Sequence, residues 1–127
     1  MKILGLDHLV LTVADIEASC AFYESVLGCR IERFDDDRHA IHFGTQKINL
    51  HKSGAEREPK AQRALPGTAD ICLIASTPLP DVIAHLESHG VAVELGPVPR
   101  TGARGPIISV YIRDPDLNLI EIANEAG

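Results

Sequence analysis

The alternation of apolar and polar residues divides the chain into short strand-like and helix-like segments. Residues 8–13 and 70–75 are apolar and rich in branched side chains, which is typical of β-strands. Each is followed by a stretch in which apolar residues recur every three or four positions, the spacing of one helix face. These positions are Ile16, Cys20, Tyr23 and Leu27 in the first stretch, and Leu79, Val82, Ile83 and Leu86 in the second.

Polar residues and glycines mark where the two helices begin and end. Asp15 and Thr77 stand at the expected N-cap positions, and Pro78 suits the first turn. Gly28 and Gly90 suit the left-handed conformation that commonly ends a helix. We therefore predict one helix between Asp15 and Gly28 and a second between Thr77 and Gly90.

Each half of the chain contains three further predicted strands. They are at 29–35, 39–43 and 46–52 in the first half, and at 92–95, 107–113 and 119–124 in the second. The order β-α-β-β-β therefore occurs twice. The segment 53–67 is polar and contains two prolines, so it is predicted to link the halves.

The two halves also resemble each other residue by residue. When GLDHLVLTVADI (5–16) is written above GTADICLIASTP (67–78), His8 falls on Asp70, and the same spacing carries Gly28 onto Gly90 without a gap. One such unit is too small to close its own sheet. We predict a single-domain α+β fold in which two βαβββ modules, 1–52 and 68–127, form a curved eight-stranded mixed sheet with the helices outside.

Glu121 is a carboxylate in the middle of an otherwise apolar strand, and burying it is costly unless a partner compensates its charge. If equivalent positions of the two modules meet, His8 faces Asp70, and Glu121 faces the strand QKINLHKS, whose alternation puts Asn49 and His51 on one face. Imidazoles and carboxylates gathered in one cavity suit a divalent metal such as Zn, Fe, Mn or Ni. The candidate ligands are His8, His51, Asp70 and Glu121, with Asn49 as the alternative to His51.

Composition excludes some classes of function. A net charge of −6 without a basic cluster argues against a nucleic-acid partner. No apolar run approaches the roughly 20 residues of a membrane helix, and the N-terminus lacks a secretory cleavage pattern, so we expect a cytoplasmic protein without membrane contact. Cys20, Cys29 and Cys72 share no metal or redox spacing and are predicted to be buried thiols of a reducing compartment.

Two further groups of residues are predicted to have no chemical role. Asp114-Pro115-Asp116 reads as a structural turn. The histidines expected at the surface are His39, His42, His85 and His89, of which His42 has an alternative place in the cavity.

Two long stretches of the chain resemble the vicinal oxygen chelate superfamily, which includes glyoxalase I, fosfomycin-resistance proteins, extradiol dioxygenases and bleomycin-binding proteins. They are LDHLVLTVADIEASCAFYESVLG near the front and GPVPRTGARGPIISVYIRDPDLNLIEI near the back. The chain is most similar to small glyoxalase-domain proteins whose first half closes with a strand like KINLHK. The resemblance implies the fold but no particular substrate, because this fold hosts several chemistries.

The resemblance also implies roles for individual residues. His8 matches the family's first-strand ligand, and Glu121 matches its last-strand carboxylate. Asp70 departs from the pattern, since metal-dependent members usually have His there. Matching INL to IEI places Asn49 opposite Glu121, whereas coordination chemistry favours His51, roughly 6.6 Å further along the strand.

A Gly- and Pro-rich segment, GPVPRTGARGPIIS (96–109), is predicted to be a long loop that acts as a lid or binding loop. Its Arg100 and Arg104 suit an anionic substrate such as a carboxylate or phosphonate. Tyr111 and Arg113, on the adjoining strand, are expected to face the same cavity. With Asn49, these four residues form the predicted substrate-binding set.

Two classes of function follow from these candidates. In the first, a metal-dependent enzyme binds adjacent oxygens of a small substrate, and Glu121 or His51 moves a proton, giving glyoxalase-type lysis or isomerisation, or ring opening with O₂. In the second, the departure at Asp70 marks a non-catalytic protein of the bleomycin-resistance type that sequesters a small molecule. Either protein is predicted to be a homodimer, because the edge strands need covering and related small members pair in this way.

Overall fold

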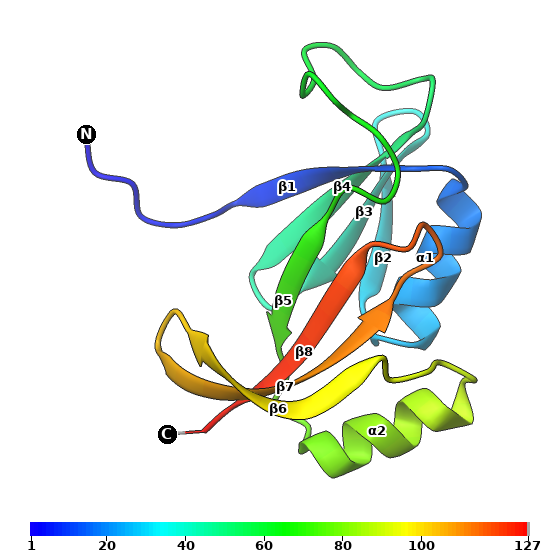
Figure 1. The fold of residues 1–127 in the computed structure, drawn as a ribbon. Helices are drawn as coiled ribbons and strands as arrows, with labels where there is room; N and C mark the ends of the chain where they lie inside the picture. The colour runs from blue at the N-terminus through cyan, green and yellow to red at the C-terminus, as the bar shows by residue number, and fades with distance from the viewer. Residues whose placement is uncertain (127) are drawn as a thin grey trace. The chain divides into compact units, whose positions relative to one another are not determined.

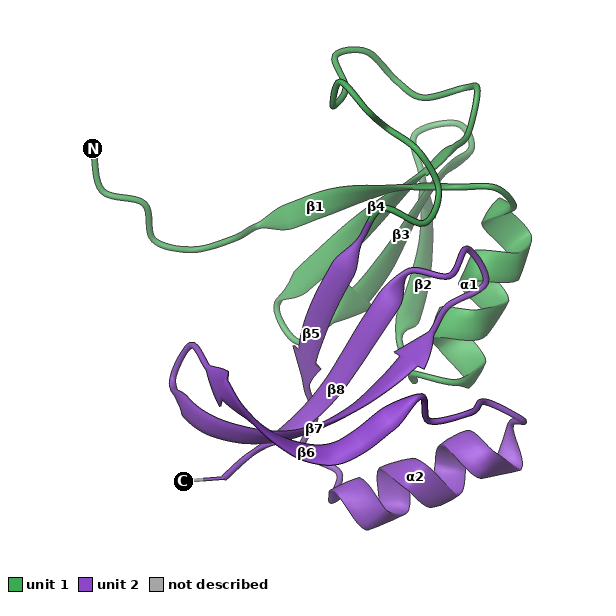
Figure 2. Ribbon diagram, viewed as in Figure 1, with its two compact units in different colours: residues 1–68 green, residues 69–127 purple. Residues whose placement is uncertain are grey.

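A computed structural model describes residues 1–126 of the chain. Two compact units, residues 1–68 and 69–127, each contain one βαβββ module (Figure 2). The first unit includes the whole segment 53–67 that the sequence marks as a linker. Across the described residues, no helix combines the length and the apolar character that crossing a membrane requires.

Module one consists of β1 (His8–Val13), α1 (Ile16–Ser25), β2 (Arg30–Phe34), β3 (Arg38–Phe43) and β4 (Gln46–Lys52) (Figure 1). Its strands form one sheet in the order β1-β4-β3-β2, in which β1 runs parallel to β4 and the other pairs are antiparallel. The Asp15 carboxylate accepts a hydrogen bond from the Ala18 N–H at 3.1 Å, so the predicted N-cap of α1 is confirmed.

The helix α1 packs against β2, β3 and β4 through the apolar face that its spacing predicts. Cys20 and Tyr23 on the helix are buried, and so are Ile41 and Ile48 on the sheet. Burial of each large apolar side chain contributes about 1.5–3 kcal/mol relative to exposure. This face of the sheet is therefore the core of module one, which leaves its opposite face for other roles.

Module two consists of β5 (Asp70–Ile74), α2 (Leu79–Ser88), β6 (Leu95–Gly102), β7 (Gly105–Arg113) and β8 (Leu119–Glu125) (Figure 1). Its sheet has the order β5-β8-β7-β6, again with one parallel pair, β5 and β8. The repeated βαβββ order and the α+β class are confirmed. The eight strands lie in two four-stranded mixed sheets, one for each module.

The predicted N-cap at Thr77 is wrong. The N-cap residue of α2 is Pro78, which has no side-chain cap, and the helix begins at Leu79. The amide of Asn124, on β8, replaces a local cap: its oxygen accepts from the Leu79 N–H at 2.8 Å, and its nitrogen donates to the Thr77 carbonyl at 2.9 Å. A distant residue thus satisfies the free N–H group that a local side chain normally satisfies.

The predicted loop at 96–109 is also wrong, because most of it forms the hairpin of β6 and β7. The two strands pair from Val98 with Ser109 to Gly102 with Gly105, with an irregularity between Leu95 and Val98. Prolines within a strand suggested a loop, but β6 is the edge strand of its sheet. An edge strand tolerates proline because one side of its backbone needs no partner.

The turn at Asp114–Asp116 is structural, as predicted. The buried Asp114 carboxylate accepts hydrogen bonds from the backbone N–H groups of Asp116 and Asn118, both at 2.9 Å. Asn118, also buried, accepts in turn from the Ala69 N–H at 2.9 Å. These bonds fix the start of β8 against the start of β5, which sets the register of the strand that carries Glu121.

Candidate functional site

The predicted site residues of module one share one face of its sheet. The parallel pairing joins His8 to Lys47, Val10 to Asn49 and Thr12 to His51, and paired residues point to the same side. The side chains of His8, Asn49 and His51 therefore lie on the face opposite to the core, as the alternation along β4 predicts.

The predicted site residues of module two likewise share one face. Glu121 pairs with Cys72 on one side and with Tyr111 on the other. Asp70 lies two residues before Cys72, and Arg113 two residues after Tyr111, so both point to the same side. Arg100 pairs with Ile107, whose side chain also belongs to this face.

The strand registers identify the counterpart of Glu121 in module one. Cys72 follows Asp70 by two residues, as Val10 follows His8. Cys72 pairs with Glu121, and Val10 pairs with Asn49. Asn49 is therefore the structural equivalent of Glu121, in agreement with the INL–IEI alignment, and His51 occupies the position equivalent to Ala123.

The carboxylate of Glu121 has a hydrogen-bond partner within its own module. The Ser109 hydroxyl, which is fully buried, donates to Glu121 Oε2 at 2.5 Å. Glu121 is half-buried, so both solvent and this charge-assisted hydrogen bond stabilise its negative charge. This arrangement explains how an otherwise apolar strand carries a carboxylate in its middle.

Cys72 lies beside Glu121 and is exposed, so its predicted burial is wrong. It belongs to an edge strand and points to the polar face of the sheet, whereas Cys20 and Cys29 are buried as predicted. Partial desolvation of the sulfur and the negative charge of Glu121 raise the pKa of the Cys72 thiol to about 11. The thiol is therefore neutral and is no ready nucleophile or thiolate ligand.

The three predicted substrate-binding arginines have different surroundings. Arg100 donates through Nε to the Tyr111 hydroxyl at 2.9 Å. Arg104 is exposed and pairs with Glu125 at 3.5 Å. Arg113 makes two hydrogen bonds to Glu94, at 2.9 and 3.0 Å, and one to the Leu117 carbonyl, so its donors are largely used within the module.

His8 is oriented by its neighbour Asp7. The two side chains are joined between Nδ1 and a carboxylate oxygen at 2.8 Å, and this bond lowers the pKa of Asp7. Because a carboxylate only accepts, Nδ1 carries a proton, and in the neutral tautomer Nε2 is the nitrogen with the lone pair. This is the orientation that histidine ligands of metals usually have.

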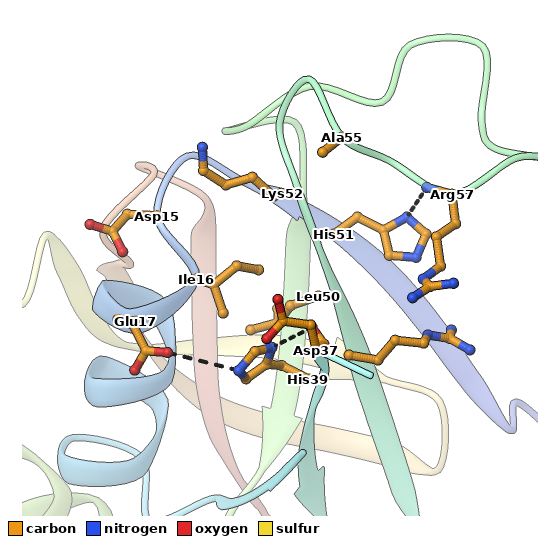
Figure 3. Close-up of a pocket in the computed structure, with 11 residues that line it drawn as sticks. Asp15, Ile16, Glu17, Asp37, His39, Leu50, His51, Lys52, Ala55 and Arg57 are labelled. Carbon is orange, nitrogen blue, oxygen red and sulfur yellow. Dashed lines mark hydrogen bonds and ion pairs between the residues drawn. The ribbon is translucent and has the colours of Figure 1, made fainter. Parts of the chain in front are cut away.

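His51 has the opposite orientation. Its Nδ1 accepts a hydrogen bond from the backbone N–H of Arg57 at 3.4 Å, so the neutral ring carries its proton on Nε2 (Figure 3). Nε2 is buried and has no hydrogen-bond partner among the described residues. Burial, and then the positive charges of Arg38 and Arg57, lower the pKa of His51. In this state His51 is a neutral donor rather than a metal ligand.

His39 is buried, so its predicted surface position is wrong. It pairs with Leu50 and points to the core face, where its Nε2 accepts from Arg33 at 3.0 Å and its Nδ1 donates to the Asp37 carbonyl at 3.1 Å. The alternation of His39 with Ile41 along the strand is the signal for this placement. His42 is half-buried and bonds to Glu32 at 2.8 Å, while His85 and His89 are exposed as predicted.

Two hollows in module one share His51 as a lining residue. The first, of about 500 Å³, lies between the start of α1, the start of β3, the end of β4 and the following loop (Figure 3). The second, of about 430 Å³, lies between β1 and the segment 59–68. Basic residues also line the two hollows, and no sequence motif marks them, because only the folded chain brings them to His51. They include Arg38, Arg57, Lys60 and Arg63.

Each module offers a limited set of donors for a metal ion. Within neither module does the described part of the chain bring together three His, Cys, Asp or Glu side chains suited to hold an ion. His8 fits a ligand by its free Nε2, and Glu121 and Asp70 fit by their carboxylates on one face. His51 does not fit, because its Nε2 carries the proton.

The lowered pKa of His51 gives a first prediction. An NMR titration of its imidazole is expected to show a midpoint below the ordinary value of 6.5. Between that midpoint and pH 6.5 the unfolded chain binds more protons than the folded one, so the free energy of unfolding should fall as pH drops through this window. In Arg57→Ala the midpoint should rise, because one neighbouring positive charge is gone. A wild-type midpoint at or above 6.5 would contradict the assigned surroundings of the ring.

Two successive βαβββ modules are the architecture that the resemblance to the glyoxalase family implies, and comparison with known proteins agrees. The model of the Glyoxalase/Bleomycin resistance protein/Dioxygenase superfamily matches residues 5–122. The chain is 55% identical over 123 residues to virulence protein STM3117 of Salmonella typhimurium, covering 97% of this chain and 85% of that protein. It is 47% identical over 124 residues to glyoxalase domain-containing protein RDO1 of Mycosarcoma maydis, covering 98% and 70%. The chain therefore belongs to this superfamily.

Solved structures support the same assignment. The integron cassette protein VCH_CASS1 from V. cholerae superimposes with a TM-score of 0.96 at 55% identity, covering 99% of this chain and 98% of that one. Lactoylglutathione lyase from Agrobacterium tumefaciens (TM-score 0.74, 22% identity, 97% and 95% covered) and the antibiotic-binding protein TnmS3 from Streptomyces sp. CB03234 (TM-score 0.78, 19% identity, 99% and 99% covered) share the fold alone. Enzymes and binding proteins thus use one architecture.

Proposed function

We propose that this protein is a divalent-metal-dependent enzyme acting on a small, oxygen-rich, anionic molecule. The observation that carries the proposal is the polar face of the second sheet. There Glu121 is held by Ser109 at 2.5 Å, and Asp70, Tyr111 and Arg100 point to the same side. A carboxylate fixed in the centre of a strand, with a cation and a hydroxyl beside it, suits both metal binding and proton transfer.

The candidate ligands that we propose are Glu121 and Asp70 in module two and His8 in module one. They provide the imidazole and carboxylate donors that Zn, Fe, Mn and Ni accept. Once bound, the ion supplies Lewis acidity toward adjacent oxygens of the substrate. His51 is not among the proposed ligands, because its Nε2 carries a proton and acts as a hydrogen-bond donor.

The other residues of this face have roles that follow from their contacts. Ser109 holds one carboxylate oxygen of Glu121, which leaves the other oxygen for the ion. Released from the ion, that oxygen would take a proton from a substrate carbon next to a carbonyl. Because the Tyr111 oxygen accepts from Arg100, its own proton is directed elsewhere and serves as a donor to a substrate oxygen. The positive charge of Arg100 favours an anionic substrate on this face.

A second candidate is a non-catalytic binding protein that sequesters a small molecule. The specific observation in its favour is Asp70, where the metal-dependent members of the family usually have His.

Under either candidate we propose a homodimer. The strands β5 and β6 are the edge strands of their sheet, and pairing with a second chain would cover their unpaired backbone groups. Light scattering that gives the mass of one chain at micromolar concentration would count against the dimer.

Metal content and calorimetry test the enzyme proposal. After removal of bound metal with a chelator, the wild-type protein is expected to bind one equivalent of a divalent first-row ion. His8→Ala should weaken this binding at least about tenfold, or about 1.4 kcal/mol, because it removes the imidazole donor. His85→Ala is the matched control. The exposed rings of His85, on α2, and His89, just after α2, have their centres 4.3 Å apart, so they are the obvious adventitious site. A wild-type protein that binds no metal would leave the binding-protein candidate standing.

A further inference from the structure

Hydrogen-bond donors without acceptors gather around His51 in module one. The β3–β4 register pairs His39 with Leu50, so the next residues outward, Arg38 and His51, are neighbours on the polar face. Arg57 joins them because its backbone N–H binds the His51 ring. In the described part of the chain neither guanidinium has a salt bridge, and Arg38 lies 4.7 Å over the Phe34 ring.

His51 adds a third donor to the two guanidiniums. Its Nε2–H is buried and has no partner among the described residues. A buried donor that is left unsatisfied destabilises the protein, so an acceptor that reaches it is bound favourably. Beside His51 lie the guanidiniums of the half-buried Arg38 and the exposed Arg57. Two positive charges next to one buried, unpartnered donor favour a ligand whose acceptor carries negative charge.

The acidic residues of the first hollow do not supply that acceptor. Asp15 is occupied as the N-cap of α1, and Glu17 bonds to Arg33 through both carboxylate oxygens at 3.3 Å. Both lie at the helix side of the hollow, away from His51 and Arg57 (Figure 3). Asp37, in the turn before β3, is exposed. Its backbone carbonyl accepts a hydrogen bond from His39 Nδ1.

The second hollow extends from His51 along an apolar surface. Val10 and Leu65, which are 45% and 55% exposed, line it together with Ala61 and Ala64. Apolar side chains exposed beside a few convergent polar groups are typical of a small-molecule site. Both hollows fall in the volume range of such sites, about 300–1,000 Å³.

We propose that module one binds a small organic acid at His51. Its anionic head group accepts hydrogen bonds from His51 Nε2–H and from the guanidiniums of Arg38 and Arg57, and its apolar body lies against Val10 and Leu65. This site uses none of the proposed metal ligands and needs no metal. It gives His51 the role of an anion-binding donor.

The test uses the whole, chelator-treated protein, so that failure of the metal proposal leaves it unaffected. Calorimetric titration with benzoate is compared with benzamide, which has the same shape without the charge. Benzoate is expected to bind at least about tenfold more tightly, because charged hydrogen bonds are lost with benzamide. Phenylphosphonate identifies the head group: tighter binding than benzoate assigns a phosphonate or phosphate, and weaker binding assigns a carboxylate.

Variants locate the binding. Arg57→Ala and Arg38→Ala should each weaken benzoate binding about tenfold, whereas Arg30→Ala, an exposed arginine of β2 that lines neither hollow, should leave it unchanged. Saturating benzoate should also raise the pKa of His51 in the NMR titration, since a nearby anion favours the imidazolium. Equal affinity for benzoate and benzamide, or benzoate binding that survives both arginine substitutions, would overturn the proposal.

Discussion

Gly96→Ala is expected to lower the free energy of unfolding by about 4 kcal/mol, because the added methyl group brings both backbone strain and a steric clash. Gly96 has a φ of +112°, which an L side chain rarely adopts. An added Cβ would overlap the Ser109 carbonyl oxygen and lie 3.0 Å from Val110 Cα. Both neighbours are backbone atoms of β7, so no side chain can move aside to relieve the contact.

Gly105→Ala separates the cost of the positive φ from the cost of the steric overlap. Gly105 has a φ of +134°, but nothing lies within 4 Å of an added Cβ, so only conformational strain of about 2 kcal/mol is expected. Chemical denaturation of both variants measures the difference. If Gly96→Ala is no more destabilising than Gly105→Ala, the close approach of β6 to Ser109 does not exist in solution.

Glu121→Gln is expected to weaken divalent-metal binding at least about 100-fold, or about 2.7 kcal/mol. Gln keeps the length of the side chain and an oxygen that accepts from Ser109, but it loses the negative charge that an ion of charge +2 requires. Calorimetric titration against the wild-type protein measures the loss.

Two matched variants make this result specific to Glu121. Glu125→Gln removes a carboxylate from the same strand, where Glu125 is exposed and pairs with Arg104, and should leave metal affinity unchanged. Ser109→Ala should cost about tenfold, the usual effect of losing a group that orients a ligand. Unchanged affinity in Glu121→Gln would refute Glu121 as a ligand, whereas equal losses in Glu121→Gln and Glu125→Gln would indicate non-specific charge.

The local elements were predictable from the sequence because their signals are local. Apolar residues at steps of three and four predicted α1 and α2, and Asp15 was identifiable as a cap because its partner, Ala18, lies three residues away. The repeat then predicted the βαβββ order of both modules, and with it the strand that carries Glu121. These features depend on spacing along the chain, and spacing is what a sequence states directly.

Contacts between distant residues were not predictable in the same way. The cap of α2 comes from Asn124 on β8, and a hairpin formed where Gly and Pro suggested a loop, because the position of β6 at a sheet edge was unknown. The choice between Asn49 and His51 as the counterpart of Glu121 needed the strand registers. The alternation along β4 places both side chains on the same face, so it does not distinguish them.

By itself, the sequence determined that this protein has two βαβββ modules of the glyoxalase superfamily and that each places imidazole or carboxylate groups on one face of its strands. The tertiary structure alone decided the state of those groups. Ser109 binds Glu121 across two strands, and the Arg57 backbone reaches His51 from a loop and directs its proton to Nε2. A side chain's proton and charge depend on the atoms that surround it, and only folding brings those atoms together.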